Sequence, residues 1–585
     1  MDDFHNIHEY RRSDTTTTHD ISHFITILLK ALPEKASIPF HNPNQEKSIH
    51  NEKGVDADII VQNAHSSFFP YLWLSYTARR QTIGLTPAPE THGERIERLL
   101  IHCYDDRIEQ RQTDRSMANT KLVCLKEGSL HSTKDYINAL EHLISVDEVR
   151  NYLETQVLIA PMDYPGQRYV RCAINHYINT GDVSNVQQQI LHIVPMIGPL
   201  HVSLNSRETV FLLNYQFFDK LFHEVFGRQK VLAKKPKPYK INLLLELASQ
   251  GWSRVRVLVM RKFEQFKDAE ARYLINLLDN IIPLVLDFYP VIFRSGNWPA
   301  YKEAMFRVWA IFYQYHRKNY NKLPLAFLSD VFYWANTNHP ISQVLTDSLH
   351  VFNDYYVENF HSSLRRQIQK SNTAEQIIQR AQIIDRMRGN NSFANVFFEK
   401  HNIRYSAKQL EYLEKHTALF LLQLFTDVYK NLNSPKIILS NARSKSKVCE
   451  LPTLGIQVDV KILPMAWNTT HPPQMNRFCD LEECSNSCEV GCVLTCGHAY
   501  HYECFFLQLG SQCQYCTAYL VSGIEYNCRI FQKSVSSFNE ASTDEHTVEL
   551  DMEVDDSDTG NDDFSLSHDN IDLLFARALN TLTSV

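Results

Sequence analysis

Two short apolar runs are the clearest strand signals in the first third of the chain. Residues 157–160 are uniformly apolar, and the segment PMDYPG that follows is rich in turn-forming residues. This pattern predicts a buried strand whose end delivers Asp163 into a turn. The second run, 190–197, ends in Gly-Pro and is followed closely by His201. Residues 1–155 otherwise carry only weak periodicity.

Apolar and aromatic residues then recur every three or four positions over most of 208–432, which predicts a long helical region. Its most apolar stretch, 274–293, is interrupted by Asp279 and Asp287. We therefore interpret that stretch as a buried helix pair and not as a membrane span. Loops are expected where Lys, Pro, Gly and Asn gather, at 234–238, 296–299 and 336–340.

The last quarter of the chain changes character. Residues 433–475 contain a Ser-Lys-Ser-Lys segment and scattered prolines, which is typical of a linker. Residues 476–530 are rich in cysteine, and 531–585 are acidic and rich in Ser and Asp, which favours disorder. Within that tail, 571–582 has the spacing of one short amphipathic helix.

Length and charge narrow the class of protein only a little. The 585 residues allow several domains, and 11% aromatic residues can fill a sizeable core. Those values exclude a small disulfide scaffold and a wholly disordered chain. The net charge of −7 includes eleven acidic residues and no Lys or Arg in 540–563, so the rest of the chain is mildly basic at +4. Charge therefore excludes neither nucleic acid nor protein partners.

Cysteine usage is more informative. Of thirteen cysteines, nine lie between Cys479 and Cys528, and the others are scattered singly. Scattered single cysteines are typical of buried free thiols in an intracellular protein. The chain opens with polar residues and not with the apolar stretch of a secretory signal. We expect an intracellular protein, nuclear or cytoplasmic, without a membrane partner.

The dense part of the cysteine region has the spacing of zinc ligands. Zinc takes four nitrogen or sulfur donors, and pairs separated by one or two residues let one turn supply two of them. Residues 496–516 contain six such donors, which is more than one zinc ion can use. Two ions are therefore implied, and a further pair of donors upstream must complete the set of eight. Among the upstream cysteines, we take Cys479 and Cys484 as this pair, because the loop from Cys484 to Cys496 is long enough to return to the site. Four residues separate the two cysteines, which is an unusual spacing for such a pair. The predicted ligands are Cys479, Cys484, Cys496, His498, His501, Cys504, Cys513 and Cys516.

These residues resemble the two-histidine variant of the RING-type zinc finger, over 476–520. The resemblance implies an interleaved cross-brace, with Cys479, Cys484, His501 and Cys504 on one structural zinc and Cys496, His498, Cys513 and Cys516 on the other. It also implies recruitment of a ubiquitin-conjugating enzyme, as in a ubiquitin ligase. The chain departs from the family pattern at Glu483, Gln514 and Thr517, where active members often carry an apolar residue, Pro and a basic residue. A protein-interaction module is thus the alternative to a ligase.

Carboxylates elsewhere suggest a second kind of chemistry. Two-metal phosphoryl transfer needs several carboxylates that converge, because Mg²⁺ prefers oxygen ligands. Asp2 and Asp3 open the chain, Asp163 ends an apolar run, and Glu358 lies one helical turn before His361. Taken singly, each of them is better explained as a turn cap or a solvated helix residue than as a metal ligand.

Residues 1–430 resemble transposase-derived proteins of mobile elements that have an RNase H-like core of the Asp-Asp-Glu type. The strings that carry this resemblance are DDFHNIH, PMDYPGQ, GPLHVSLNSRE, AKKPKPYKINLLLELASQGW and YYVENFHSSLRR. The resemblance implies an α/β core with a large helical insertion between the second Asp and the Glu. It makes Asp2 or Asp3 the first carboxylate, for which we take Asp3, with Asp163 second, Glu358 third and His201 accessory. Mg²⁺ would be the cofactor if this site is competent.

One departure weighs against nuclease activity. In such a core the first Asp lies on the central strand, yet only Met1 precedes Asp2. We therefore expect most of that strand to be absent, and the core to be a truncated, catalytically inactive relic. DNA remains a candidate partner, because clustered positive charge supplies sequence-independent affinity for phosphates. The candidate contacts are Lys234, Lys235, Lys237 and Lys240.

The sequence thus predicts a partial RNase H-like α/β region (1–205), a mostly helical insertion with its closing helix (206–432), a linker (433–475), a RING-type finger (476–530) and an acidic disordered tail (531–585). Three functional hypotheses follow. The chain is a ubiquitin ligase or protein-interaction module that binds two structural zinc ions; it is a transposase-like or nuclease-like DNA-binding protein; or it is an inactive domesticated relic. Its expected partners are a ubiquitin-conjugating enzyme, an unidentified protein or DNA.

Overall fold

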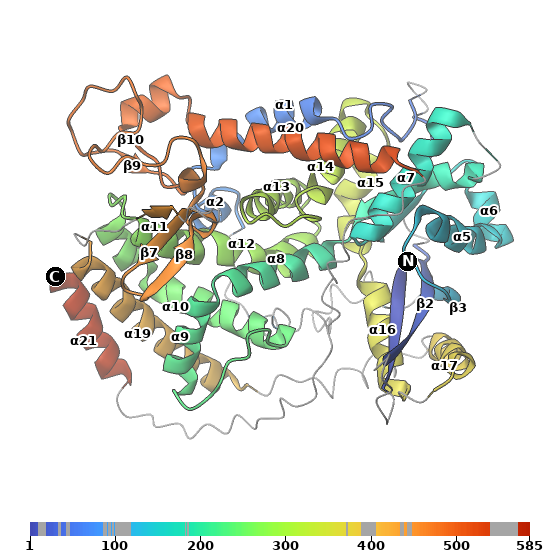
Figure 1. Cartoon of the computed structure of the whole chain (residues 1–585), viewed down its shortest axis with the longest axis horizontal. Coiled ribbons are helices and arrows are strands. Elements are labelled where there is room, and N and C mark those ends of the chain that lie inside the picture. Colours follow the sequence, from blue (N-terminus) through green and yellow to red (C-terminus); the bar gives the residue numbers. More distant parts are fainter. Residues whose placement is uncertain are drawn as a thin grey trace.

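The computed structural model describes residues 1–9, 19–32, 37–42, 47–85, 91, 95, 99, 117, 119–181, 183, 186–369, 372–387, 405–432, 438–440, 447–538 and 571–584. Helices form the middle of the elongated body, and small sheets lie toward its two ends (Figure 1). The fold is therefore mixed α/β and mainly helical. The predicted acidic segment 540–563 lies outside the described residues.

The N-terminal region alternates strands and helices. Its antiparallel sheet has the order β1-β2-β3, and β4 pairs with β5 in parallel. The elements are β1 (Asp2–Glu9), β2 (His19–Lys30), α1 (Ala57–Ser67), η1 (Phe69–Tyr71), α2 (Tyr76–Thr82), β3 (Thr120–Glu127), α5 (Thr133–Ile144), α6 (Asp147–Tyr152), β4 (Leu158–Met162), α7 (Tyr164–Thr180), η2 (Gln188–His192) and β5 (Ile193–Ile197).

The strand predicted for 157–160 is present and turns where expected, and the second apolar run contributes the strand β5. β4 ends at Met162, and Asp163 caps helix α7 by accepting a hydrogen bond from the Gly166 amide at 3.0 Å. β5 is buried along its whole length, which explains its uniformly apolar sequence. Helix α7 thus starts at the carboxyl end of β4 and crosses over to the adjacent parallel strand β5. Functional side chains commonly gather at this end of parallel strands.

The strand that carries the first candidate carboxylates differs from our expectation. We expected most of it to be absent, but β1 runs eight residues from Asp2 and pairs with β2 along its length. Strand β1 thus consists of Asp2, Asp3 and the residues that follow them, and not of residues that precede them. One face places Phe4 in a core with Phe360 of helix α16 (Tyr355–Gln367), while the other places Ile25 of β2 in a core with α5 and α7. Helices thus cover both faces of the sheet.

The helical body agrees with the pattern predicted for 208–432. Its loops fall at the predicted places, since α10 starts at Pro238, α13 at Trp298 and α15 at Ile341. The elements are α8 (Pro199–Leu213), α9 (Tyr215–Phe226), α10 (Pro238–Phe263), α11 (Ala269–Asn276), η3 (Leu277–Ile281), α12 (Ile282–Asp287), η4 (Phe288–Phe293), α13 (Trp298–Gln314), α14 (Leu323–Asn336), α15 (Ile341–Ser348), η5 (Leu349–Val351), α16 (Tyr355–Gln367), α17 (Ala374–Met387) and α19 (Ala407–Lys430).

The apolar helix Ala269–Phe293 is long enough to cross a membrane, but 89% of its most apolar window is buried within the body. The acidic residues inside it are paired with polar groups of neighbouring helices. Asp279 accepts hydrogen bonds from Trp252 and Arg256 at 2.8 and 2.5 Å, and Asp287 pairs with an arginine of α2 at 2.7 Å. Buried charges are tolerated in a protein interior when they are paired in this way. The pairing therefore supports the interpretation of this helix as part of the protein core.

The segment interpreted as a linker is folded where the structure describes it. Leu451, Leu463 and Trp467 are buried in the main core, because the segment packs between the helical body and the cysteine region. Its elements are β6 (Ile438–Ser440), β7 (Lys447–Leu451), β8 (Ile456–Asp459), η6 (Val460–Ile462) and η7 (Met465–Asn468). Proline and serine there mark turns between short elements and not a free connection.

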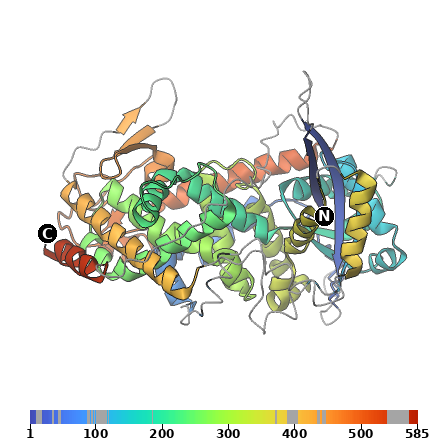
Figure 2. The same cartoon turned by 90° about the horizontal axis from the view of Figure 1, so that it is seen from below.

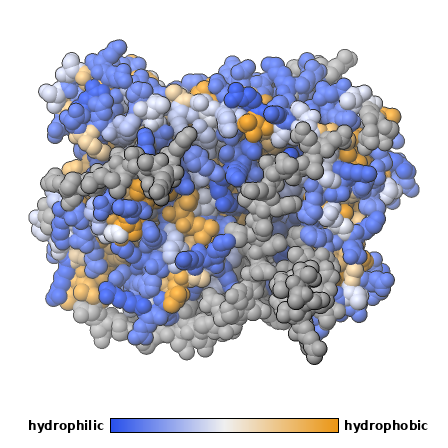
Figure 3. Space-filling model, in the orientation of Figure 1, coloured by the Kyte–Doolittle hydropathy of each residue, from blue (hydrophilic) through white to orange (hydrophobic). Residues whose placement is uncertain are grey.

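The C-terminal elements lie against the body. They are β9 (Cys492–Val493), β10 (Ala499–Tyr500), η8 (Cys504–Gln508), α20 (Gln514–Ser536) and α21 (Ile571–Ser584). Helix α20 crosses the body from the cysteine region to α7, and α21 lies along α19 (Figure 1, Figure 2). The short helix predicted for 571–582 is therefore confirmed. On the face seen in Figure 1, apolar surface forms scattered patches among hydrophilic ones (Figure 3).

One partly exposed histidine makes the fold acid-sensitive. Burial lowers the pKa of His50 to about 4, against the opposing effect of the Leu191 carbonyl, which lies 2.6 Å from its Nε2. A depressed histidine pKa gives stability that is complete above pH 6.5 and is lost as the pH falls toward 4. Between pH 7 and 5, wild type should lose about 2 kcal/mol of unfolding free energy that His50→Gln does not lose. Urea unfolding at both pH values measures this, and the exposed His65→Gln should behave as wild type.

Candidate metal centre

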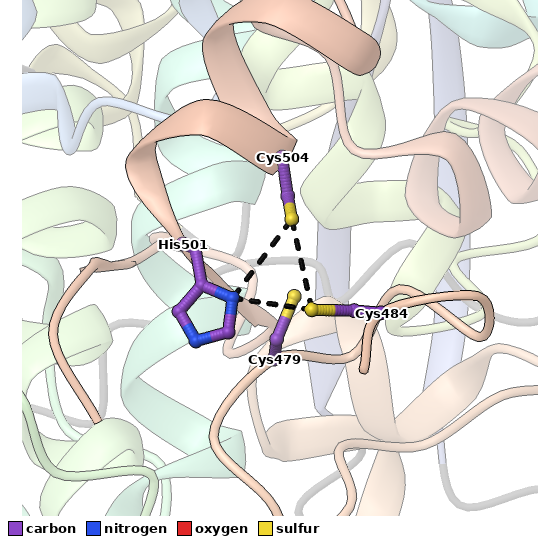
Figure 4. Close-up of side chains that lie close together, drawn as sticks. All are labelled: Cys479, Cys484, His501 and Cys504. Carbon is purple, nitrogen blue, oxygen red and sulfur yellow. Dashed lines mark hydrogen bonds between the residues drawn. The ribbon is translucent and has the colours of Figure 1, made fainter. Parts of the chain in front are cut away.

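Four cysteine and histidine side chains of the cysteine region point toward one another (Figure 4). This first cluster consists of Cys479, Cys484, His501 and Cys504, whose donor atoms all lie within 4.8 Å of one another. The His501 Nδ1 is 3.2 Å from the Cys484 Sγ and 3.8 Å from the Cys504 Sγ. Donors around a tetrahedral zinc are separated by about 3.3–3.8 Å. The cluster therefore has nearly the size that zinc requires.

A second cluster of the same composition lies at the start of α20. It consists of Cys496, His498, Cys513 and Cys516. The His498 Nδ1 is 3.7 Å from the Cys496 Sγ, 3.2 Å from the Cys513 Sγ and 3.5 Å from the Cys516 Sγ. Three thiols and one imidazole form a donor set typical of structural zinc. The chain thus contains two Cys₃His clusters that could hold zinc.

The two clusters interleave along the chain. The first takes one pair from 479–484 and another from 501–504, whereas the second takes its pairs from 496–498 and 513–516. Each cluster therefore reaches over a pair that belongs to the other. A metal ion in either cluster would close a loop that contains part of the other site, so the two sites brace each other.

Local structure explains the spacing of the second cluster. Between Cys496 and His498, Gly497 has a φ of 102°, and a Cβ there would lie 2.2 Å from the Trp467 ring. Only glycine satisfies both conditions, so the turn that aims two donors at one point depends on it. At the other end, Cys513 immediately precedes α20 and Cys516 lies in its first turn. Three residues of separation across a helix start place both thiols on one side.

Backbone carbonyls orient both histidine rings. The Nε2 of His498 lies 2.8 Å from the His471 carbonyl oxygen, and that of His501 lies 2.6 Å from the Cys488 carbonyl oxygen. With Nε2–H donating to a carbonyl, the Nδ1 lone pair is left to face the three thiols. Outer hydrogen bonds of this kind fix the tautomer of metal-bound histidine. Neither carbonyl could be identified from the sequence, because a backbone acceptor has no residue signature.

Electrostatics of the thiols favour a bound cation. Burial raises the pKa of Cys496 and of Cys516 well above the usual thiol value. For Cys513, the polar contacts with Cys496, Cys516 and His498 outweigh burial and lower the pKa well below that value. One thiolate is thus stabilised, while further deprotonation places negative charges side by side. A divalent cation removes that repulsion, and its binding would release protons.

The other cysteines of the region lie outside both clusters. Cys488 is exposed, and the Cys492 Sγ faces the Tyr500 carbonyl at 3.7 Å. Cys528 is buried in the middle of α20. The structure thus brings together all eight predicted donors, in the predicted pairing, and places these three cysteines elsewhere.

The cysteine region is joined to the helical body by buried polar contacts. The Lys267 Nζ donates to the carbonyls of Arg477 and Phe478, both at 3.1 Å, and to the Asp480 carboxylate at 2.8 Å. Asp480 also accepts a hydrogen bond from the Ala499 amide at 2.7 Å, next to the second cluster. The ends of this ion pair are 8% and 3% exposed. Both clusters therefore depend on the body for their immediate support.

The predicted carboxylates converge in part. Asp2, His201 and Glu358 bring their donor atoms within 4.8 Å of one another, and we call them the acidic cluster. Asp3, our choice for the first carboxylate, lies on the opposite face of β1, because side chains alternate along a strand. The assignment of Asp3 to this site is therefore corrected to Asp2. Asp163 is not within that group, although its charge acts on the same buried Met1 amine as Asp2 does.

An acidic residue that the sequence analysis missed completes this region. Asp354 accepts hydrogen bonds from the Leu200 amide at 2.9 Å and from His201 Nδ1 at 2.5 Å. It approaches so closely that a Cβ on Gly198 would lie 2.2 Å from its carboxylate. Asp354 lies one helical turn before Glu358, a spacing that could have revealed it. Although burial opposes it, the charges of Asp354 and Glu358 raise the pKa of His201 well above its usual value.

The lysines proposed to contact DNA do not share one environment. Lys234 and Lys235 are exposed, and Lys237 is partly buried at the start of α10. Lys240 is only 9% exposed and lies 5.3 Å from the ring centre of Phe222. It is therefore withdrawn from the predicted DNA contacts, because α10 turns its side chain toward the core.

No protein-family model matches the chain, no curated protein resembles it, and no solved structure matches its fold. Its function must therefore be inferred from its own residues.

Proposed function

We propose that the chain is a RING-type zinc-finger protein that binds two structural zinc ions and recruits a ubiquitin-conjugating enzyme. The observation that supports this most strongly is the interleaving of two Cys₃His clusters. The same interleaving distinguishes a cross-braced finger from two fingers in series. The ubiquitin-ligase role rests on the resemblance of residues 476–520, together with this geometry.

The composition of the clusters assigns a structural role to the metal. Each offers four protein donors, which fills the tetrahedral shell of zinc and leaves no position for water or substrate. Catalytic zinc sites usually have three protein ligands and an open position. The function of the region would therefore lie in the surface that the metal shapes and not in chemistry at the metal.

Exposed apolar side chains near the first cluster offer a contact surface for a partner. Tyr502, Phe506 and Leu507 are 48%, 41% and 82% exposed, and all lie on the segment that carries His501 and Cys504. Trp73 of the body packs against Phe506 with ring centres 5.7 Å apart, which holds this segment in place. Exposed aromatic and aliphatic residues on a rigid support are typical binding residues. We assign this surface to the conjugating enzyme.

The ligase role is tested with the full chain and not with an isolated finger, because contacts with the body support the two clusters. Discharge of ubiquitin from a panel of charged conjugating enzymes should be accelerated by wild type. Leu507→Asp should reduce the acceleration at least tenfold while retaining both zinc ions. The matched control is Val257→Asp, an aliphatic residue 68% exposed on α10. No acceleration with any enzyme would refute the ligase role, and equal acceleration by both variants would refute the assignment of this surface to the conjugating enzyme.

The acidic cluster supports a second candidate function, Mg²⁺-dependent cleavage of DNA. The supporting observation is that Asp2 and Glu358, from the two ends of the proposed core, lie within 4.8 Å of each other and of His201. Oxygen donors that converge in this way suit Mg²⁺. Against it, the protonated His201 already compensates the carboxylates. Mg²⁺- or Mn²⁺-dependent cleavage that Glu358→Gln abolishes would support this function, and no cleavage by wild type would leave the cluster as a relic.

A further inference from the structure

A fourth group of side chains that could hold a metal ion lies away from the cysteine region and is distinct from the acidic cluster. Asp3 of β1, His23 of β2 and His131 of the loop before α5 place their donor atoms within 4.8 Å of one another. They lie on the face of the sheet opposite the acidic cluster, since Asp3 and Asp2 are neighbours on one strand. No proposed step of the ligase or nuclease function uses them.

The distances suit a small transition-metal ion. The Asp3 Oδ2 and His23 Nδ1 are 3.2 Å apart. Two donors at tetrahedral positions, each about 2.0–2.1 Å from zinc, are separated by about 3.3 Å. The rings of His23 and His131 lie 5.4 Å apart at 78°, so the second imidazole approaches the first edge to face.

The backbone places the third donor independently of any ion. The Gly128 amide donates to the His23 carbonyl at 2.9 Å, which ties the loop after β3 to β2. On the other side, the His131 amide donates to the Asp135 carboxylate at 3.1 Å, and Ser132 caps α5. The loop is therefore fixed on both sides of His131. A site whose donors are already held in place loses less conformational entropy when it binds a ligand.

Exposure distinguishes this group from the two cysteine clusters. The Asp3 and His23 side chains are 14% and 28% exposed, and His131 is exposed. Three protein donors leave at least one coordination position open to solvent. Imidazole donors favour zinc, cobalt, nickel or iron over Mg²⁺ and Ca²⁺.

From these observations we propose that Asp3, His23 and His131 form a site for an exchangeable divalent transition-metal ion, with water or a small anion as its remaining ligand. The site is separate from the proposed cysteine sites in donor type and in position. Its metal would be lost and regained more readily, because it has fewer protein donors and is open to solvent.

Cobalt binding to the full chain tests the proposal. Co²⁺ in the cysteine clusters gives thiolate charge-transfer absorption, whereas Co²⁺ bound by two imidazoles and a carboxylate gives only d–d bands. Wild-type protein preloaded with two equivalents of zinc should bind a further equivalent of Co²⁺ without charge-transfer absorption. His131→Gln and Asp3→Asn should each weaken this binding at least tenfold. The control is His142→Gln on α5, whose ring faces Lys126 at 3.5 Å and belongs to no cluster.

Equal Co²⁺ binding by wild type, His131→Gln and Asp3→Asn would overturn the proposal, as would no Co²⁺ binding beyond the cysteine clusters. Failure of the cysteine clusters themselves would appear differently, as an absence of charge-transfer absorption when metal-free protein is titrated. The two results are therefore independent.

Discussion

Cys513→Ala is expected to lose one zinc ion per chain and to unfold the cysteine region. Its Sγ lies 3.2 Å from the His498 Nδ1 within the second cluster. A structural zinc contributes about 10–16 kcal/mol of apparent binding free energy, which exceeds what a small region could lose and stay folded. Because the clusters interleave, the first should also lose affinity. Metal analysis and hydrogen exchange over 476–520 measure the two effects.

Cys492→Ala is the matched control for that variant. It removes a thiol from the same region, but one that faces the Tyr500 carbonyl and belongs to neither cluster. It should keep both zinc ions and the protection of 476–520 from exchange. If Cys492→Ala loses zinc and Cys513→Ala does not, the assignment of the second cluster is wrong.

Asp480→Ala is expected to destabilise the chain by about 3–5 kcal/mol, because it leaves a buried ammonium group without its carboxylate. Burial lowers the pKa of Lys267, and Asp480 is the main group that opposes this effect. The variant also removes the acceptor of the Ala499 and Gln474 amides, at 2.7 and 2.8 Å. Urea unfolding followed by fluorescence measures the loss.

Two comparisons separate this ion pair from ordinary surface charge. Asp427→Ala breaks an exposed pair with Lys430, whose side chains are 55% and 57% exposed, and should cost less than about 1 kcal/mol. Adding Lys267→Met to Asp480→Ala removes the stranded charge and should recover part of the stability. A loss of less than about 1 kcal/mol for Asp480→Ala would mean that the pair does not hold the cysteine region to the body.

The donor atoms could be predicted because their information is local. Cys496 and His498 lie on one turn, and Cys513 and Cys516 on the first turn of one helix, so spacing alone specifies which residues share an ion. The apolar runs before Asp163 and His201 gave the two parallel strands for the same reason. Short-range periodicity also sufficed for the helical body.

The rest depends on contacts between distant segments. The choice between Asp2 and Asp3 requires the register of β1 against β2, which no local pattern specifies. Lys267 and Asp480 are more than two hundred residues apart in the sequence, so no local pattern could have predicted their ion pair. Trp467 lies in a segment with linker-like composition, yet it packs under Gly497 and is 5% exposed. The composition of a segment describes its average character, whereas a few buried residues can decide that the segment folds against the body.

The central claim is that two interleaved Cys₃His sites each hold a zinc ion. Zinc X-ray absorption on the full chain, loaded with two equivalents of zinc, tests it most directly. The expected result is an average of three sulfur donors at about 2.3 Å and one nitrogen donor at about 2.0–2.1 Å per zinc. Cys513→Ala loaded in the same way should lose sulfur donors, and Cys492→Ala should not. A shell dominated by nitrogen and oxygen, or only one tightly bound zinc per chain, would contradict the claim.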